Sequence, residues 1–208
     1  MQVDIPYNFY QEYLDNDNSK KFNEIFDKRI NDIKKKYAVK NNVSVGYMLQ
    51  EYFVEIFSWS VIPKKVLSII DSYIKSHELK GVIDPCCGNA FHNYLFKKFC
   101  QLDTITVDIQ NETNSWLPIH EQEGREFMAD ITNDEHKKYA LILSWIDYES
   151  LTIDLLRLYK GSMVISIGNY EKLSPNYIKE LKDNYTLLNR FILNMPWGLS
   201  EKIEVYVR

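Results

Sequence analysis

Hydrophobic and polar residues follow two different periods along this 208-residue chain, and the period changes near Gly81. Before that point, apolar residues recur every three or four positions, which indicates amphipathic helices. Two such helices are predicted over residues 22–37 and 44–57. A third is predicted to open at Pro63, because proline suits the first helical position. The pattern therefore predicts a helical N-terminal extension over residues 1–80, packed on the core that follows.

From Gly81 onward, short apolar runs alternate with helical segments. This alternation indicates a mostly parallel sheet covered by helices on both faces. The connection between the last two runs is too short for a helical crossover, so they are predicted to pair antiparallel. The predicted strands are residues 82–84, 105–109, 127–129, 141–145, 163–167, 186–193 and 203–207. The predicted helices are residues 91–99, 151–159 and 175–184, the last capped by Ser174 with Pro175 in its first turn.

Composition narrows the classes of function. The formal net charge is −4 and the pI is about 5.6, which argues against a nucleic-acid footprint over the whole surface. A lysine run at residues 34–36 is the best candidate for a local basic patch, and it is read as a solvated helix face. The three cysteines and four histidines lack the spacing of metal ligands, so no metal site is predicted. No apolar run approaches the roughly 18 residues needed to span a membrane, and no signal peptide is recognised, so a cytoplasmic protein is expected.

The stretch from Gly81 to His92 is the most informative in the sequence. It joins a strand end to an acid at Asp84, a small-residue turn around Gly88 and a helix, which is how an α/β sheet builds a pocket for a nucleoside-bearing cofactor. Asp108 ends the next predicted strand, where its carboxylate could accept both hydroxyls of a ribose. Asp130 follows the third predicted strand, and its neighbour Ile131 could pack on an adenine ring.

Each of these residues also has a purely structural interpretation. Asp84 could cap the helix that follows, and Asp108 and Asp130 could be ordinary strand-end or turn acids. Trp145 could be a core aromatic, and Asp147 or Tyr148 could simply start a helix. The remaining candidates are two cysteines read as small packing residues and a histidine read as structural, with a role beside the cofactor as its alternative: Cys86, Cys87 and His92. The spacing of Asp84 and Asp108, after two apolar strands, favours the cofactor interpretation.

Four segments resemble the motifs of the class I S-adenosylmethionine-dependent methyltransferases. Residues 84–90 read Asp-Pro-Cys-Cys-Gly-Asn-Ala and resemble the D-P-C-C-G-x-G form of the first motif. Asp108 matches the ribose-binding acid of the second motif, residues 129–131 resemble the adenine-contacting third motif, and residues 139–148 occupy the fourth. The resemblance covers about residues 81–208. It implies an α/β, Rossmann-like methyltransferase fold with a mostly parallel seven-stranded sheet and an antiparallel last strand, preceded by N-terminal helices.

More narrowly, the chain resembles a little-characterised branch of methyltransferase-like proteins. In that branch, a segment like residues 57–63 precedes the first motif and Leu-Ser-Trp stands at the fourth. The layout of residues 156–161 and 164–168 also matches. This resemblance implies that the N-terminal helices wall one side of the pocket.

Two positions depart from the motifs. Ala90 stands where a third glycine is usual, at a cost of about 1 kcal/mol if its φ is positive. At the fourth motif, Ser144-Trp145-Ile146-Asp147 replaces the Pro-Pro sequence of amino-methylating nucleic-acid enzymes.

The resemblance implies S-adenosylmethionine as cofactor and a methyl acceptor that the sequence does not identify. A small molecule or protein is slightly favoured over nucleic acid. The expected cofactor-binding residues are Asp84, Cys86, Gly88, Asn89, Ala90, Asp108, Ile109, Asp130 and Ile131. The expected acceptor-side residues are Ser144, Trp145, Asp147 and Tyr148. Two alternatives stay open: a methyltransferase-like binding or scaffold protein without catalysis, and, ranked last because no G-x-G-x-x-G is present, a dehydrogenase.

Overall fold

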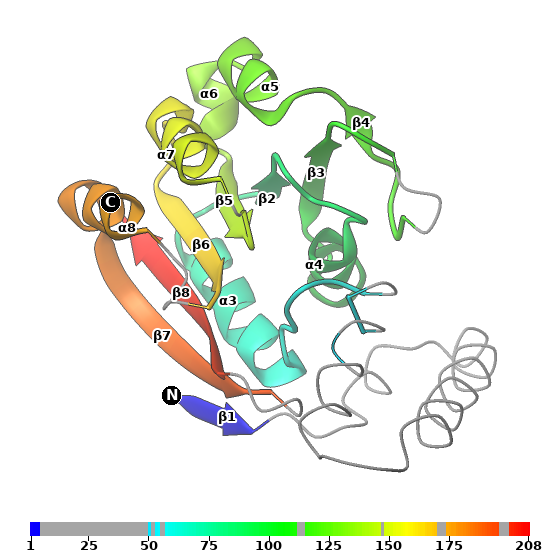
Figure 1. Cartoon of the computed structure of the whole chain (residues 1–208), viewed down its shortest axis with the longest axis vertical. Helices are drawn as coiled ribbons and strands as arrows, with labels where there is room; N and C mark the ends of the chain where they lie inside the picture. The colour runs from blue at the N-terminus through cyan, green and yellow to red at the C-terminus, as the bar shows by residue number, and fades with distance from the viewer. Residues whose placement is uncertain are drawn as a thin grey trace, which may run out of the picture.

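A sheet of eight strands forms the centre of the described part of the chain (Figure 1). The computed structural model describes residues 1–4, 50, 53–54, 57–111, 115–146, 148–169, 174–195 and 200–208. Along the sheet the strands run in the order β1-β7-β8-β6-β5-β2-β3-β4. Their bounds are β1 Gln2–Asp4, β2 Gly81–Asp84, β3 Asp103–Asp108, β4 His120–Glu121, β5 Tyr139–Ser144, β6 Met163–Gly168, β7 Thr186–Asn194 and β8 Ser200–Val207.

All strand pairs are parallel except those made by β8. This strand inserts between β6 and β7 and runs antiparallel to both, with Gly168 opposite Lys202 and Leu193 opposite Glu201. The predicted antiparallel pairing of the last two strands is therefore confirmed. This mostly parallel sheet with antiparallel C-terminal pairing is the Rossmann-like methyltransferase fold that the sequence predicts.

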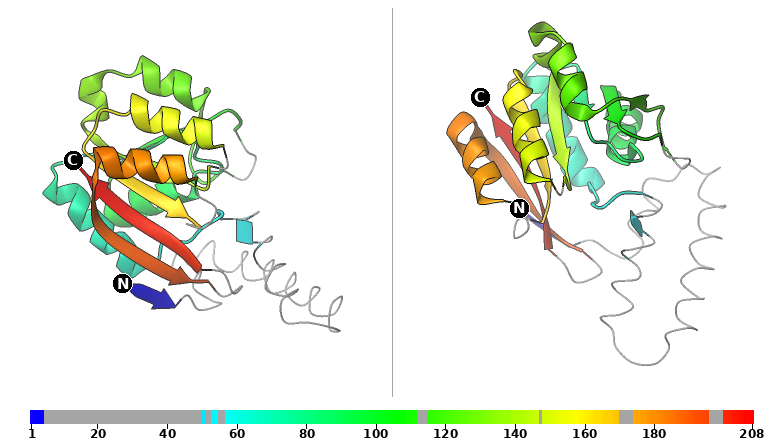
Figure 2. Two further views of the ribbon diagram at one scale, coloured as in Figure 1. Left: turned by 60° about the vertical axis from the view of Figure 1, so that its left-hand side comes forward. Right: turned by 45° about the horizontal axis from the view of Figure 1, so that its top comes forward.

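Helices cover both faces of the sheet, as two of the views show (Figure 2). α3 (Lys64–Ser76) and α4 (Phe91–Cys100) pack on one face, while α5 (Gly124–Asp130), α7 (Glu149–Leu158) and α8 (Pro175–Asn184) pack on the other. The short α6 (Asn133–His136) joins α5 to β5. Neighbouring strand residues point to opposite faces, so Val82 enters the first core and Ile83 the second. The near-continuous apolar strands of the sequence follow from this double burial.

The predicted helices after Gly81 are confirmed. Local hydrogen bonds and a proline explain where α8 begins. The Ser174 hydroxyl accepts a hydrogen bond from the Tyr177 N–H at 3.0 Å, and Pro175 occupies the first turn of α8. Pro63 is the residue before α3 rather than its first residue, so that prediction is wrong by one position. Its missing N–H costs the helix nothing there, because the first N–H groups have no partner within a helix.

The predicted strand at residues 127–129 is wrong, because these residues belong to α5. The Glu123 side chain caps this helix by accepting a hydrogen bond from the Glu126 N–H at 3.0 Å. A run of three apolar residues is too short to distinguish a strand from a helix. The sheet position after β3 is instead taken by β4, two exposed residues that pair with the end of β3.

The N-terminal region also differs from the predicted helices at one described place. Residues 2–4 form β1, which lies parallel to β7 at the edge of the sheet. With β1 and β4 present and residues 127–129 helical, the sheet has eight strands where seven were predicted. The predicted helix at residues 22–37 and the lysine run at 34–36 lie outside the described residues. Of the predicted helix at 44–57, Gln50, Phe53 and Val54 are described as helical.

The proposed division into residues 1–80 and 81–208 stays a prediction. Within the described residues, however, α3 packs on α4 and contributes to the same apolar core as the sheet. No helix in this part of the chain is long and apolar enough to cross a membrane.

Candidate functional site

A cavity of about 490 Å³ opens at the edge of the sheet where the direction of strand order reverses. β2 lies between β3 and β5. The chain adds β3 and β4 on one side of β2 and then adds β5 and β6 on the other side. In open α/β sheets ligands bind outside the carboxyl ends of the strands at this position. Asp84, Asp108 and Ser144 are the last residues of β2, β3 and β5, and all three line the cavity.

Asp84 is nearly fully buried at the end of β2, with 2% of its surface exposed. One carboxylate oxygen accepts a hydrogen bond from the Cys86 N–H at 3.3 Å, and no described residue donates to the other oxygen. Burial raises the pKa of Asp84 to about 7, and the nearby Asp108 carboxylate adds to the effect. A positive charge bound beside Asp84 would favour its ionised form.

Asp108 is tied to the glycine turn that follows β2. Its Oδ2 accepts a hydrogen bond from the Gly88 N–H at 2.8 Å, while its Oδ1 accepts none from the described residues. Gly88 has a φ of +54°, and a side chain built there would meet no atom within 4 Å. The turn therefore presents bare backbone to open space beside two carboxylates, which is the arrangement that lets a ligand approach closely.

Ala90 has the left-handed conformation that its place in the turn requires, with φ of +63°. Its N–H donates to the Cys87 carbonyl at 2.8 Å, and it stands immediately before α4. Asn89 supports the same turn, because its side-chain oxygen accepts from the Phe91 N–H at 3.2 Å. The substitution of alanine for the usual glycine therefore preserves the loop at a conformational cost of about 1 kcal/mol. We call Asp84, Gly88, Asn89 and Asp108 the acidic wall.

The opposite side of the cavity is aromatic. Trp145 follows β5 with a φ of +50°, a conformation that is rare for a bulky side chain. The backbone N–H of Trp145 donates to the Ile167 carbonyl at 3.0 Å, and its indole passes 3.9 Å from the position of a Cβ on Gly168. The ring centroid of Trp59 lies 5.8 Å from that of Trp145, with a 32° angle between the planes. Because Trp59 is 54% exposed, this pair opens to solvent as well as to the cavity.

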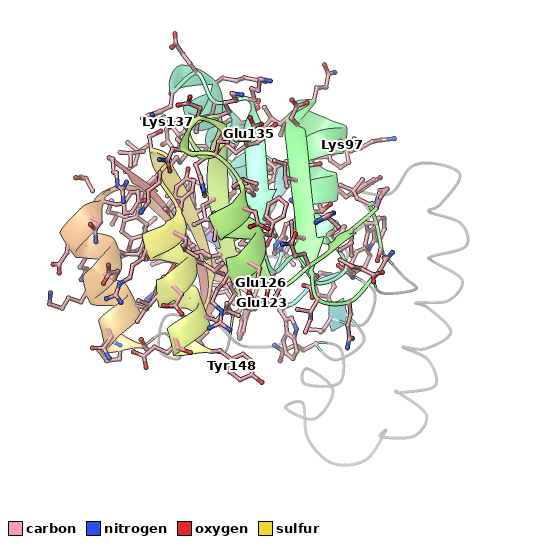
Figure 3. The ribbon with its side chains drawn as sticks, turned by 90° about the horizontal axis from the view of Figure 1, so that it is seen from above. Lys97, Glu123, Glu126, Glu135, Lys137 and Tyr148 are labelled. Carbon is pink, nitrogen blue, oxygen red and sulfur yellow. The ribbon has the colours of Figure 1, made fainter. Side chains whose placement is uncertain are left out.

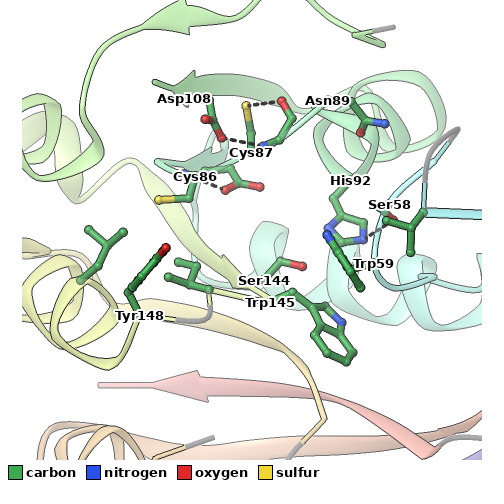
Figure 4. A pocket seen from close by; sticks show the side chains of 15 residues that line it. Ser58, Trp59, Cys86, Cys87, Asn89, His92, Asp108, Ser144, Trp145 and Tyr148 are labelled. Atoms are coloured by element: carbon green, nitrogen blue, oxygen red, sulfur yellow. Dashed lines mark hydrogen bonds between the residues drawn. The ribbon is translucent and has the colours of Figure 1, made fainter. Parts of the chain in front are cut away.

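His92, in the first turn of α4, completes this side. Its Nε2 lies 3.0 Å from the Ser60 carbonyl oxygen and 3.2 Å from the Ser58 hydroxyl. Burial lowers the pKa of His92 to about 4, so the imidazole is neutral at physiological pH. In Figure 4 His92, Ser58 and Trp59 lie together on one side of the cavity, and Tyr148 lies on the other. We call Trp59, His92 and Trp145 the aromatic wall.

The two adjacent cysteines line the cavity next to Asp84. Burial raises the pKa of the Cys86 thiol to about 12 and that of the Cys87 thiol still further, and the neighbouring carboxylates act in the same direction. Both are therefore neutral thiols, and a thiolate nucleophile is not available here at physiological pH.

Not all of the predicted site residues come together. Tyr148 lines the rim and is 73% exposed, pointing away from the ribbon in Figure 3. Ile109 is 66% exposed beyond the end of β3. The predicted strand that Asp130 would follow is instead part of helix α5, and Asp130, the last residue of this helix, accepts a hydrogen bond from the Gln122 side chain at 2.9 Å. Neither Asp130 nor Ile131 is among the described lining residues, and Asp147 lies outside the described part of the chain.

Three lining residues come from before the glycine turn: Val54, Ser58 and Trp59. The sequence marks residues 57–63 only as a segment that resembles a family, and it predicts no role for any single side chain there. The signal that marks Trp59 is its position between two serines, flanked by Phe57, Val61 and Ile62, all fully buried. Because the residues on both sides of Trp59 are buried in the core, they hold Trp59 in place at the cavity.

The electrostatic character of the cavity is negative. Two carboxylates line it, and its described lining contains no lysine or arginine. A cationic ligand would gain from both carboxylates, whereas a phosphate would be repelled by them without a compensating side chain.

Comparison with known proteins places the fold. No protein-family model and no curated protein sequence matches this chain. Among solved structures, the chain is similar to a SAM-dependent methyltransferase from Archaeoglobus fulgidus, at 14% identity over 78% of this chain and 99% of the other, with a TM-score of 0.50. The chain has the class I methyltransferase fold.

Two further structures reach slightly lower scores. They are the methyltransferase domain of bacterial CtHen1-CN, at 15% identity, 68% and 97% coverage and a TM-score of 0.48, and an uncharacterised protein from Listeria monocytogenes, at 15% identity, 71% and 68% coverage and a TM-score of 0.49. At 14% identity, the likeness to the Archaeoglobus fulgidus structure concerns the fold alone.

Proposed function

We propose that this protein is an S-adenosylmethionine-dependent methyltransferase. The observation that carries the proposal is the acidic wall: two carboxylates at the ends of adjacent parallel strands, beside a glycine turn with open space in front of it. The cofactor combines a ribose with an ammonium and a sulfonium. Hydroxyl donors and positive charge are what two carboxylates without a neighbouring cation can bind.

The residues fit such a cofactor in a defined order. Asp84, with Cys86 and the turn Gly88–Ala90, would hold the methionine end, where the ammonium meets the carboxylate. Asp108 would hold the ribose through the oxygen that Gly88 leaves unused, with Ile109 beside it. Asp130 and Ile131 are left out, because Asp130 ends α5, Ile131 follows it, and neither is among the described lining residues.

The chemistry of the group is simple, which limits what the protein must do. When bound, S-adenosylmethionine supplies an activated methyl group, so the chain needs mainly to position the acceptor and exclude water. Ser144, Trp145 and Tyr148, together with Asp147, would face the acceptor. Acceptors that are poor nucleophiles would in addition need a proton acceptor nearby.

The acidic wall also weighs against the dehydrogenase alternative. A dinucleotide carries a pyrophosphate, and sites for it use backbone N–H groups at a helix N-terminus, free of nearby negative charge. Here the Gly88 N–H is already bound by Asp108, and Asp84 stands beside the same turn. The alternative of a non-catalytic protein rested partly on Ala90, which adopts the conformation that a glycine would have.

The proposal is tested by calorimetric titration of the folded chain with S-adenosylmethionine, using two variants of Asp108. Asp108→Ala should weaken binding at least about tenfold, as expected for loss of a charge-assisted hydrogen bond. Asp108→Asn is the matched control for the loop, because an amide oxygen can still accept from Gly88. It should weaken binding too, since the charge is gone. Unchanged affinity in both variants, or no heat up to millimolar ligand, would refute the proposal.

The same purified protein can be tested separately for cofactor binding and for catalysis. If the chain binds S-adenosylmethionine but transfers no methyl group to tested small molecules, proteins or nucleic acids, the binding-protein alternative gains over the enzyme.

A further inference from the structure

A polar cluster joins the aromatic wall to the beginning of β8. The Ser60 hydroxyl donates to the carboxyl group of Glu201, which lies on β8 and is fully buried. The Ser60 carbonyl in turn lies 3.0 Å from Nε2 of His92, and the Ser58 hydroxyl contacts both. Because β8 runs antiparallel, its beginning lies at the same sheet edge as the carboxyl ends of β5 and β6. The cluster thus fixes the turn that carries Trp59.

This anchoring determines the tautomer of His92. A carbonyl oxygen can only accept a hydrogen bond, so the proton of the neutral ring must be on Nε2. Nδ1 then carries a lone pair and is an acceptor. No described residue donates to it, and His92 itself lines the cavity. Burial and the nearby N-terminus of α4 both oppose a positive charge on the ring.

The residues around this lone pair favour one kind of ligand over others. Trp59 and Trp145 pack against each other, with ring centroids 5.8 Å apart, and both line the cavity with aromatic surface. The described lining holds no cationic side chain, and both acids are on the acidic wall. A carboxylate or phosphate would therefore meet a lone pair and two negative charges. An uncharged N–H or O–H on a planar ring would meet an acceptor and aromatic faces.

We propose that His92 is the residue that orients the methyl acceptor, and that the acceptor is an uncharged N–H or O–H nucleophile carried on a planar aromatic ring. This inference rests on the proposed function, since it assigns the second half of the same cavity. His92 accepts the hydrogen bond of the nucleophile and aims its lone pair, but it does not retain the proton, because a base must titrate near the working pH to do so. The proton leaves to solvent.

Two substitutions separate the atoms of this ring. In His92→Asn the side-chain oxygen stands at the same number of bonds from Cα as Nδ1, so it keeps the acceptor and loses the anchor. In His92→Gln the amide nitrogen can replace Nε2, so it keeps the donor to Ser60 and loses the acceptor. A variant that merely destabilised the wall would affect both functions together.

The experiment begins with titration of S-adenosylhomocysteine into the three proteins, which tests the proposed function by itself. The saturated proteins are then titrated with phenol, anisole and benzoate, followed by the NMR signals of the tryptophan side-chain N–H groups. Phenol should bind the parent chain about five- to tenfold more tightly than anisole, as loss of one hydrogen bond predicts, and benzoate should bind more weakly still. His92→Asn should keep the preference for phenol, and His92→Gln should lose it.

The result that would overturn the inference is equally distinct. If S-adenosylhomocysteine binds but His92→Gln keeps the preference for phenol, or benzoate binds best, His92 does not orient the acceptor, while the proposed function stands. A ¹⁵N spectrum with the proton of His92 on Nδ1 would contradict it as well. If S-adenosylhomocysteine does not bind at all, the proposed function fails and the inference with it.

Discussion

The two walls of the cavity have opposite chemistry and are built by different means. The acidic wall comes from one short segment and the end of the neighbouring strand, joined by the bond from Gly88 to Asp108. The aromatic wall joins Trp59, His92 and Trp145 from three separate parts of the chain, held by Ser60 and Glu201. The comparison teaches that one wall is encoded by local sequence and the other by tertiary contacts. Changes to each should therefore affect different ligands.

The sharpest structural contrast is between two glycines, one on each side. Gly168, beside the Trp145 indole, has a φ of +153°, a region open only to glycine, whereas Gly88 has a φ of +54°. Gly168→Ala should lower the free energy of unfolding by about 2 kcal/mol and Gly88→Ala by about 1 kcal/mol. Neither adds a close contact, since the nearest atom to a Cβ at Gly168 is 3.9 Å away and none is within 4 Å at Gly88. Chemical denaturation checks both, and equal losses would contradict the distinction.

The pH dependence of cofactor binding should isolate the acidic wall. A cationic ligand binds the ionised form of Asp84, whose pKa burial raises to about 7 in the free protein. Affinity should therefore fall as pH drops, by about tenfold between about pH 7.5 and pH 6. Calorimetry with S-adenosylhomocysteine measures this, and Asp84→Asn is the control. That variant should bind weakly and without this pH dependence, while a steep dependence that persists in it would assign the effect to another group.

The same carboxylate should reduce the stability of the folded protein. Its pKa of about 7 exceeds the ordinary value of 3.8, so between these values the folded state binds more protons than the unfolded chain. Stability therefore falls as pH rises through this window, and the gain in the free energy of unfolding on Asp84→Asn should be larger at pH 8 than at pH 5, by roughly 2 to 3 kcal/mol. Urea denaturation at the two pH values tests it. Because Glu201 is present in both proteins, its own titration cancels in the difference.

The smallest effect is expected for Trp59→Ala. Its indole is half exposed, so the variant should lose about 1 kcal/mol or less of stability. Because Trp59 belongs to the aromatic wall, affinity for S-adenosylhomocysteine should stay within about twofold, as for sites that share no contact. A large loss of cofactor affinity would show that the two walls do not act independently.

The acidic wall could be predicted from sequence and most of the aromatic wall could not, for a physical reason. Strand ends are visible in the apolar pattern, and parallel strands bring Asp84, Asp108 and Ser144 to one edge once the fold is assigned. The contact between Ser60 and His92 joins residues 32 positions apart, and that between Ser60 and Glu201 joins residues 141 apart. No periodicity signals such pairs.

The errors in the fold have a similar origin. β1 and β4 contain three and two residues, too few to establish a period of two, and their pairing partners supply their conformation. The apolar run at residues 127–129 fits a strand on composition, but the cap from Glu123 makes it helical. The prediction that Asp130 lies beside an adenine assumed a strand at these residues, and the structure has a helix there.

The most direct test of the account is the binding of S-adenosylhomocysteine and of NAD to the folded chain, measured side by side by calorimetry. A cavity with two carboxylates and no cation in its described lining should bind one S-adenosylhomocysteine per chain, bind it at least about tenfold more weakly in Asp108→Ala, and give no heat with NAD up to millimolar concentration. Binding of NAD without binding of S-adenosylhomocysteine would contradict the proposal that the acidic wall holds this cofactor.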